Sequence, residues 1–200
     1  MMINFGGFKS LSLSDWPGEH TSVVLLRGCP LRCPYCHDQS LQKCEDQVKT
    51  DYVAALVNRG FAQVPRVLFS GGEPLMQQAA LIDIIGMLIP EIEVGLKTSG
   101  VYAGHIKELL DKELIDHVFL DLKAHCGSKY SEVTGNTING DFLFYQAMNS
   151  MALCNKYGVP VTVRTTVYRG YPDESAMEKI CGLLSIYDVD RLVVRKTMAD

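Results

Sequence analysis

Three cysteines lie close together in the run GCPLRCPYCH at positions 28–37. The C-x3-C-x2-C spacing of Cys29, Cys33 and Cys36 allows three thiolates on one tight loop to bind three irons of a cubane cluster. A [4Fe–4S] cluster ordinarily takes four thiolates, but Cys44 stands apart from the run and belongs to no supporting motif. The spacing therefore predicts a cluster whose fourth iron is open to another ligand.

An open iron is the site that S-adenosylmethionine (SAM) needs, because its amino nitrogen and carboxylate oxygen can chelate one iron. Two other interpretations of the cysteines stay open at this point. Zinc prefers repeated C-x2-C pairs, and the chain has no second pair, although His37 could be a fourth zinc ligand. An ordinary electron-transfer cluster would need a distant fourth cysteine.

Strand and helix patterns alternate along the chain and must position this loop. Apolar runs predict strands at 21–26, 66–70, 93–98, 117–122, 159–167 and 191–195. Helices are expected at 51–59, with Thr50 as N-cap, and at 78–88, 103–112, 142–157 and 174–186, with an irregular loop at 130–141. Strands with little polar alternation fit a parallel sheet with right-handed crossovers. We expect an α/β fold in one domain, residues 1–200, with an N-terminal extension at 1–20.

Other reactive side chains follow the predicted strands, at the edge where ligands bind in such folds. Gly71, Gly72 and Glu73 follow the second strand. The glycines would let a ligand come close to the backbone, and the Glu73 carboxylate could accept hydrogen bonds from an ammonium. The alternative is a plain turn in which Glu73 caps the next helix.

The remaining candidates lie on the later strands. Asp121 and Lys123 point the same way, because side chains alternate along a strand, so both can reach one site. The guanidinium of Arg164 suits a carboxylate, although an internal ion pair would give the same pattern. Thr98 and Ser99 end the third strand.

Composition and charge exclude several classes of protein. The 200 residues are 47% hydrophobic and 21% charged, a typical globular balance. The net charge of −4, without a dense Lys/Arg block, argues against a nucleic-acid or membrane partner. Seven cysteines without a secretion signal do not suggest a disulfide framework. We therefore expect a cytoplasmic protein. Cys154 and Cys181 fall in helical patterns and are expected to be small core residues, whereas Cys126 either lies near the active-site mouth or has no role in the chemistry.

The cysteine loop and the Gly-Gly-Glu turn together resemble the radical SAM superfamily. The resemblance implies a partial (β/α)6 barrel with parallel strands at 21–200, a [4Fe–4S] cluster on the three cysteines, and SAM as second cofactor. It implies that SAM is cleaved reductively and that a 5′-deoxyadenosyl radical takes a hydrogen atom from the substrate. Implied SAM contacts are Gly71, Gly72 and Glu73 on the amino group, Tyr35 beside adenine, Asp121 and Lys123 on ribose or carboxylate, and also His37, Lys97, Thr98, Ser99 and Arg164.

Further motifs resemble the activating proteins of anaerobic ribonucleoside-triphosphate reductase. They are GGF at 6–8, SLSDWPG at 12–18, CPYCH at 33–37, DLK at 121–123 and RTT at 164–166. Pyruvate formate-lyase activases share much of this pattern, and both groups install a glycyl radical on a large partner enzyme. The resemblance implies such a partner and a flavodoxin- or ferredoxin-type electron donor. It also puts Asp15 near the barrel mouth, in contact with the partner's peptide, unless Asp15 is a turn residue.

Two positions depart from the activase pattern. Asp38 stands where activases often carry Asn, and Lys97 stands where they often carry the Asp of an Asp-Thr-Asn-Gly run. In related activases that Asp helps to bind a monovalent cation beside SAM. We hypothesise that the Lys97 amine replaces the cation and neutralises Asp121 and the SAM carboxylate.

Three functions compete at this point. The first is a glycyl-radical activase, and the second is a small-molecule radical SAM enzyme such as 7-carboxy-7-deazaguanine synthase, which also has a Gly-Gly-Glu-Pro motif. The third is a non-enzymatic metal-binding module, which the SAM-site residues oppose. The runs at 15–18 and 33–37 favour the activase, as does the short segment after 191–195, which leaves little material for a private substrate pocket.

Overall fold

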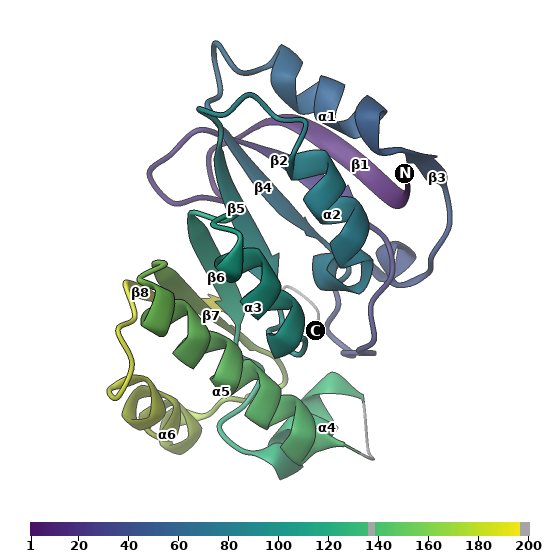
Figure 1. Ribbon diagram of the computed structural model, residues 1–200. Coiled ribbons are helices and arrows are strands. Elements are labelled where there is room, and N and C mark those ends of the chain that lie inside the picture. The colour runs from purple at the N-terminus through teal and green to yellow at the C-terminus, as the bar shows by residue number, and fades with distance from the viewer. Residues whose placement is uncertain (136–138, 197–200) are drawn as a thin grey trace. The chain divides into compact units, whose positions relative to one another are not determined.

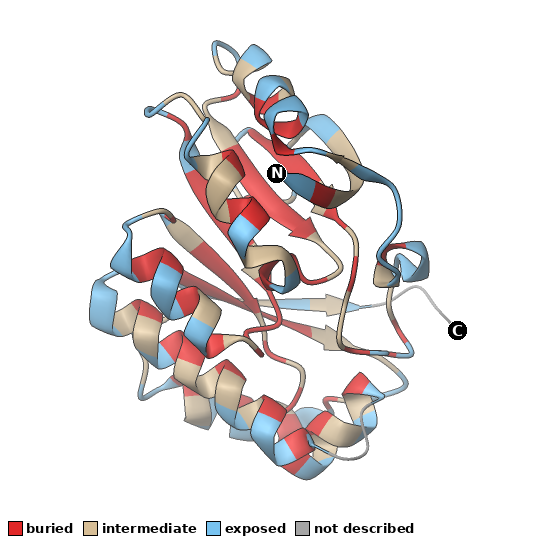
Figure 2. Ribbon diagram, turned by 45° about the vertical axis from the view of Figure 1, so that its right-hand side comes forward, coloured by how far each residue is buried: buried red, intermediate tan, exposed pale blue. Residues whose placement is uncertain are grey.

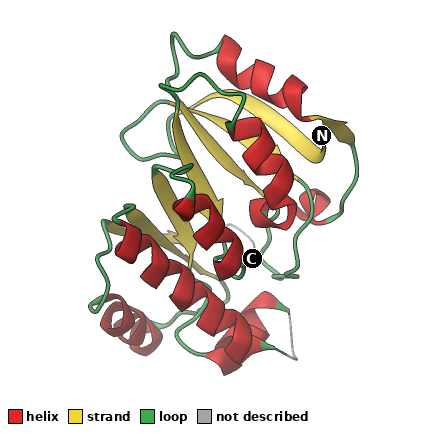
Figure 3. Cartoon of the chain, in the orientation of Figure 1, coloured by secondary structure: helices red, strands yellow, loops and turns green. Residues whose placement is uncertain are grey.

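The computed structural model describes residues 1–135 and 139–196, which form alternating strands and helices (Figures 1 and 3). The strands are β1 Met2–Ser12, β2 Thr21–Leu26, β3 Gln47–Lys49, β4 Arg66–Gly71, β5 Glu93–Thr98, β6 His117–Asp121, β7 Val161–Val167 and β8 Arg191–Lys196. The α-helices are α1 Thr50–Arg59, α2 Gln78–Ile85, α3 Ala103–Asp111, α4 Gly127–Thr134, α5 Gly140–Tyr157 and α6 Glu174–Leu184. Two short 3-10 helices are η1 Gln39–Gln42 and η2 Pro74–Gln77. Within the described residues, no helix is long and apolar enough to cross a membrane.

The chain forms two compact units, and the first comprises Met1–Pro30, Asp38–Lys97 and Leu109–Asp116. Its strands are ordered β3-β1-β2-β4-β5. The strands β2, β4 and β5 run parallel, whereas β1 pairs antiparallel with β2 and β3. Helices α1 and α2 pack side by side over one face of this sheet (Figure 1). Because β2 and β4 are parallel, the segments that follow them leave the sheet at the same edge.

The parallel strands of this unit are its core, and Figure 2 shows them as buried. Side chains on both faces are buried, which explains the near-continuous apolar runs in the sequence. The residues at 0–1% exposure include Val23, Val24 and Leu26 on β2 and Val67, Leu68 and Phe69 on β4. Burial of each such side chain stabilises the fold by ~1.5–3 kcal/mol. The strands therefore provide a rigid base for the loops at their carboxyl ends.

The second unit contains Leu31–His37, Thr98–Glu108 and the described residues from His117 onward. Its strands β6, β7 and β8 are parallel and adjacent in that order. The register places Asp121 opposite Arg164 at the carboxyl end of β6. Helix α5 packs on β6 and β7 and also against α4.

The α/β class is confirmed, and all six predicted strands are present with ends that differ by two residues at most. The N-terminal extension at 1–20 contains a strand, β1, that the sequence did not predict. The irregular loop expected at 130–141 is wrong for 130–134, where α4 is anchored by the buried side chains of Tyr130 and Thr134, and for 140–141, where α5 has already begun. Residues 136–138 of that loop, and the segment 197–200, lie outside the described residues. The division into a single domain stays a prediction.

Thr50 does not cap α1 from outside, because it is the first residue of the helix and Lys49 occupies the N-cap position. Its hydroxyl is instead 2.6 Å from Asp83 Oδ2 on α2 and 3.1 Å from the carbonyl oxygen of Met1. The hydrogen bond from Thr50 lowers the pKa of the Asp83 carboxyl. Thr50 thus joins α1 to α2, where the sequence predicted a local cap.

Candidate functional site

In the first unit, the backbone that leads to Cys29 is held on two sides. Strand β2 ends at Leu26, and the N–H of Arg27 then donates to the carbonyl oxygen of Asn4 on β1 at 2.9 Å. The N–H groups of Gly28 and Cys29 donate to the carbonyl oxygens of Leu41 and Gln42 at 2.8 and 3.3 Å. Gly28 has a φ of +93°, which a residue with a side chain rarely adopts. The backbone of residues 27–29, which begins the cysteine loop, is therefore held in one conformation by hydrogen bonds.

The Gly-Gly-Glu turn is hydrogen-bonded directly to this segment. The N–H of Gly72 donates to the carbonyl oxygen of Leu26 at 2.9 Å, and the N–H of Glu73 donates to that of Gly28 at 2.7 Å. A Cβ on Gly71 would collide with the backbone of Leu26, and a Cβ on Gly72 with the carbonyl oxygen of Gly28. Both glycines are thus required by close approach of two backbone segments, a reason that differs from the ligand approach argued from the sequence.

Glu73 caps the next helix. Its side chain is 1% exposed, and Oε1 accepts a hydrogen bond of 3.2 Å from the N–H of Leu75 in η2. This is the capping role that the sequence left as an alternative. A contact between Glu73 and the amino group of SAM stays a prediction.

Gln77, which the sequence analysis missed, joins three segments of this unit. Its Nε2 donates to the carbonyl oxygens of Asn4 and Arg27 at 3.0 and 2.9 Å. Its Oε1 accepts from the N–H and the Nδ2 of Asn4 at 2.7 and 3.0 Å. The amide therefore uses two donors and two acceptor positions, which is its usual capacity. No sequence signal distinguishes this glutamine from a surface residue.

The segment 13–20 connects β1 to β2 and lies at the amino end of the parallel strands. Arg66, the first residue of β4, contacts the Glu19 carboxylate at 2.8 Å and lies 5.9 Å above the ring of Trp16. Asp15 accepts a hydrogen bond of 2.8 Å from the Ser12 hydroxyl, which makes it a turn residue. The expected position of Asp15, near the mouth that carries the cysteine loop, is therefore wrong. The antiparallel pairing of β1 with β2 places the turn at the opposite end of β2.

In the second unit, the other two cysteines lie in one tight turn. The N–H of Cys36 donates to the carbonyl oxygen of Cys33 at 3.1 Å, and the N–H of Arg32 donates to that of Thr134 at 2.8 Å. Cys33 is buried, Cys36 is half-buried and His37 is exposed. Burial raises the pKa of the Cys33 thiol, against an opposing effect of the Lys123 ammonium.

Lys123 lies at the centre of a polar and aromatic group in this unit. Its Nζ is 3.5 Å from Asp121 Oδ2 and 5.8 Å from the centre of the Tyr35 ring. The Tyr35 ring also lies 5.5 Å from that of Tyr168, a partner that the sequence did not suggest. Burial alone would lower the pKa of Lys123, but Asp121 and the neighbouring tyrosine and cysteine groups outweigh it and raise that pKa. The two strand-end side chains thus meet, as an ion pair.

The third predicted group, Thr98 to Gly100, forms a closed turn. Thr98 and Ser99 are buried, and the Thr98 hydroxyl accepts a hydrogen bond of 3.0 Å from the N–H of Gly100. The carbonyl oxygen of Gly100 accepts from the Ser150 hydroxyl of α5 at 2.6 Å. Lys97, the preceding residue, belongs to the first unit and is half-buried.

Arg164, on β7, has the largest of the fully buried side chains among the described residues. It is 2% exposed, and its guanidinium lies 5.4 Å from the centre of the Phe119 ring. Its carbonyl oxygen accepts a hydrogen bond of 2.8 Å from the N–H of Leu122. Arg164 is therefore anchored to β6 by both its side chain and its backbone.

The candidate residues fall into two groups, one in each compact unit. One contains Cys29, Gly71, Gly72 and Glu73 in the first unit, and the other contains Cys33, Tyr35, Cys36, Asp121 and Lys123 in the second. A family model for the radical SAM superfamily matches residues 23–180, which includes both groups. The chain belongs to the radical SAM superfamily. It is therefore an enzyme.

Within the superfamily, the chain belongs to the glycyl-radical enzyme activase family. It is 31% identical over 176 residues to a candidate glycyl-radical enzyme activating enzyme of Methanocaldococcus jannaschii, covering 87% of this chain and 72% of that protein. It is also 31% identical over 166 residues to the pyruvate formate-lyase-activating enzyme of Clostridium pasteurianum, covering 80% of this chain and 66% of that protein.

Solved structures confirm the fold that the resemblance implied, a radical SAM partial barrel. Streptococcus suis SuiB bound to precursor peptide SuiA has a TM-score of 0.67 and 15% identity, covering 84% of this chain and 37% of that chain. QueE from Escherichia coli has a TM-score of 0.54 and 14% identity, covering 98% of this chain and 84% of that chain. Identities this low show a shared fold alone.

Radical SAM membership implies a [4Fe–4S] cluster and SAM, and the residues present fit both. The donor set is three thiols on one loop, none of them in a disulfide, and thiolates are the ligands that iron–sulfur clusters take. Gly71 and Gly72 have no Cβ, and this lets the Gly-Gly-Glu turn pack directly against the backbone of Leu26 and Gly28 that leads to Cys29. Among residues 1–135 and 139–196, no three His, Cys, Asp or Glu side chains are already gathered as a metal-binding group. Convergence of the three thiolates stays a prediction.

Proposed function

We propose that this radical SAM enzyme installs a glycyl radical on a large partner enzyme, and that the partner is anaerobic ribonucleoside-triphosphate reductase. The observation that carries the activase role is the 31% identity to the Methanocaldococcus jannaschii protein over 87% of this chain. The chain spans 72% and 66% of the two curated relatives described above, so the activity of the whole relatives is transferred here only as a proposal.

Cys29, Cys33 and Cys36 would hold the cluster, and the fourth iron would take SAM. When bound, the two cofactors supply one-electron cleavage of SAM, and the resulting radical can remove hydrogen from a glycine Cα. The N–H groups of Gly72 and Glu73 fix the backbone before Cys29 through their hydrogen bonds to the carbonyl oxygens of Leu26 and Gly28. A fixed first ligand limits the range of positions that the loop can adopt.

The second group of residues would hold SAM itself. The buried Tyr35 ring offers an apolar face for adenine, and Lys123 offers a cation for the SAM carboxylate while Asp121 orients it. The remaining proposed SAM contacts are His37, Glu73, Lys97, Thr98, Ser99 and Arg164. Because the Lys123 ammonium is held between an aspartate and an aromatic ring, it loses little side-chain entropy on meeting an anion.

The choice of partner rests on the motifs at 15–18 and 33–37, which resemble the ribonucleotide reductase activating proteins. The pyruvate formate-lyase-activating relative of Clostridium pasteurianum supports a pyruvate formate-lyase-type partner as the second candidate. SuiB, which was solved with a precursor peptide, fits a protein substrate. A flavodoxin- or ferredoxin-type protein would donate the electron. A reducing cytoplasm would keep the three cysteines available as thiolates.

The test is anaerobic reconstitution with iron and sulfide, reduction with dithionite, and EPR with and without SAM, followed by assay for 5′-deoxyadenosine. Each candidate partner is then mixed with the reduced enzyme and SAM, and the glycyl radical is measured by EPR. A glycyl radical on the ribonucleotide reductase alone is the expected result. A radical on the formate-lyase alone selects the second candidate, and 5′-deoxyadenosine release without a radical on either partner refutes the proposal.

A further inference from the structure

Cys44 lies beside the first proposed cluster ligand, a position that its place in the sequence does not reveal. A Cβ built on Gly28 would be 2.7 Å from Cys44 Sγ, so the sulfur rests on the backbone of Gly28. The next residue is Cys29, and consecutive Cα atoms are ~3.8 Å apart. The Cys44 thiol is exposed, whereas Cys29 is half-buried. Within the first unit, the Cys44 sulfur is therefore in contact with the residue that directly precedes Cys29.

Several hydrogen bonds and one ion pair hold the segment that carries Cys44. The carbonyl oxygens of Leu41 and Gln42 accept from the N–H groups of Gly28 and Cys29. Arg27 binds the chain on both sides of Cys44, with NH1 donating to the carbonyl oxygen of Ser40 and NH2 pairing with Asp46 Oδ2, each at 2.7 Å. The segment that carries Cys44 is thus tied to the segment that carries Cys29 at four points.

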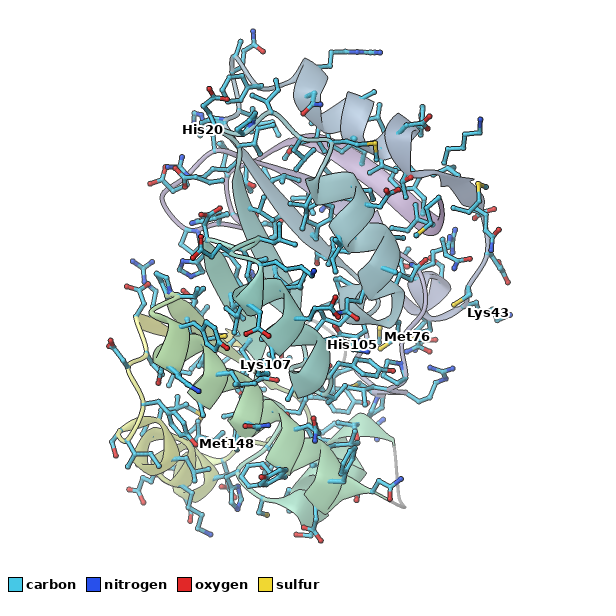
Figure 4. The ribbon with its side chains drawn as sticks, in the orientation of Figure 1. His20, Lys43, Met76, His105, Lys107 and Met148 are labelled. Atoms are coloured by element: carbon cyan, nitrogen blue, oxygen red, sulfur yellow. The ribbon has the colours of Figure 1, made fainter. Side chains whose placement is uncertain are left out.

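The sulfur of Met76 also lies beside Gly28. The Sδ of Met76, which is labelled in Figure 4, lies 3.6 Å from the position of a Gly28 Cβ. Met76 is 39% exposed, so this side chain and Cys44 cover Gly28 at the surface of the unit. Rotation of the exposed Cys44 side chain is the movement that would carry its sulfur from Gly28 towards Cys29.

We propose that Cys44 is the redox partner of Cys29, and that the two form a disulfide when the protein lacks its cluster. The inference rests on the proposed function in one respect, the role of Cys29 as a cluster ligand. Hydrogen peroxide is the oxidant: the two thiols each lose a proton and an electron as the S–S bond forms, and one peroxide is reduced to two waters. The disulfide would keep Cys29 off the irreversible part of the thiol oxidation ladder, since a thiol reductant restores it.

The intact cluster-free chain is treated with one equivalent of hydrogen peroxide, its remaining thiols are alkylated, and tryptic peptides are identified by mass spectrometry. Cleavage after Arg27, Arg32, Lys43 and Lys49 puts Cys29, the pair Cys33 and Cys36, and Cys44 on three different peptides. The expected product is peptide 28–32 linked to peptide 44–49. A link from peptide 28–32 to peptide 33–43, or an alkylated Cys44 beside an oxidised Cys29, overturns the proposal.

Two variants sharpen the test. Cys44→Ser should abolish the 28–32 link to 44–49. Cys181→Ser should leave it unchanged, because Cys181 is exposed, and its expected place in the core is wrong. Cys44→Ser should also take up as much iron and sulfide as the unaltered chain, and loaded protein should resist formation of the link. Because the linked peptide is measured without SAM or a partner enzyme, failure to form a glycyl radical leaves this result intact. A link that persists in loaded protein shows that Cys29 does not hold the cluster.

Discussion

The N–H of Glu73 donates a 2.7 Å hydrogen bond to the carbonyl oxygen of Gly28, one residue before the first proposed cluster ligand. The Gly-Gly-Glu turn is therefore part of the support of the cysteine loop. This relationship explains why two glycines precede Glu73, since the backbones approach too closely for any Cβ. A substitution in the turn should consequently shift the backbone at Cys29.

Gly72→Ala should destabilise the cluster-free protein and reduce its iron uptake. The new Cβ would collide with the carbonyl oxygen of Gly28 and lie 2.9 Å from that of Leu41, so the backbone must shift. Overpacking of this kind costs about 1–3 kcal/mol, measurable by urea unfolding. Gly104→Ala on α3 is the control, because its Cβ meets nothing within 4 Å, and it should be neutral or stabilising by ~0.5–1 kcal/mol. Equal stability of the two variants would contradict the steric argument.

Gln77→Leu should destabilise the first unit, because it removes four hydrogen bonds of one amide. The Arg27 carbonyl oxygen would lose a donor and the Asn4 N–H would lose its acceptor, whereas the Asn4 carbonyl oxygen keeps the N–H of Arg27. An unsatisfied buried polar group costs ~1–3 kcal/mol. Since these groups are partly buried, we expect about 2–3 kcal/mol in total from urea unfolding. Gln39→Leu, at an exposed position, should change stability by less than ~0.5 kcal/mol. A similar small effect at Gln77 would show that water replaces the amide.

The sequence predicts the strands and helices of this protein better than the contacts that hold its candidate site. Apolar runs such as Thr21–Leu26 predict their strands because a strand buried on both faces needs a nearly continuous apolar sequence. Strand β1 was missed because it is only partly buried and contains Gly6 and Gly7, with a shift in register between Phe5 and Gly7. Helix α4 was missed because it is short and buries only a few side chains.

Motifs indicate which residues matter, but not which contacts they make. Asp121 and Lys123 were predicted to share a site from strand alternation, and they do meet. Contacts between residues far apart in the chain, such as Gln77 with Asn4, leave no local pattern. Asp15 shows the same limit, because its position depends on the direction of a strand that the sequence did not predict.

His117 should make stability depend on pH near neutrality. Its ring stacks on Phe119 at 4.4 Å and its Nε2 lies 2.9 Å from the Thr162 hydroxyl. Burial lowers the pKa of His117 below its ordinary value of 6.5, although Asp190 opposes the effect. The unfolded chain then binds the proton more readily than the folded chain. The contribution of His117 to the free energy of unfolding should be greatest above about pH 6.5 and should be lost as the pH drops towards the lowered pKa.

The measurement is urea unfolding of the cluster-free protein at several values between pH 7.5 and 5.5. His117→Gln removes the titrating group and keeps a hydrogen-bonding amide, so it should flatten the dependence over this range. An unchanged slope in that variant would assign the dependence to other groups.

Lys97 should make the enzyme indifferent to monovalent cations. The residue stands on β5 directly before Thr98, where related activases often carry an aspartate that helps to bind such a cation. The Lys97 ammonium would supply the positive charge of that cation from the protein itself. Added K⁺ or Na⁺ should therefore not raise the rate of 5′-deoxyadenosine formation. Lys97→Ala should slow that reaction and make it respond to K⁺, whereas Lys107→Ala on α3 should do neither. Strong activation of the unaltered enzyme by K⁺, unchanged in Lys97→Ala, would show that a separate cation site exists and that Lys97 has another role.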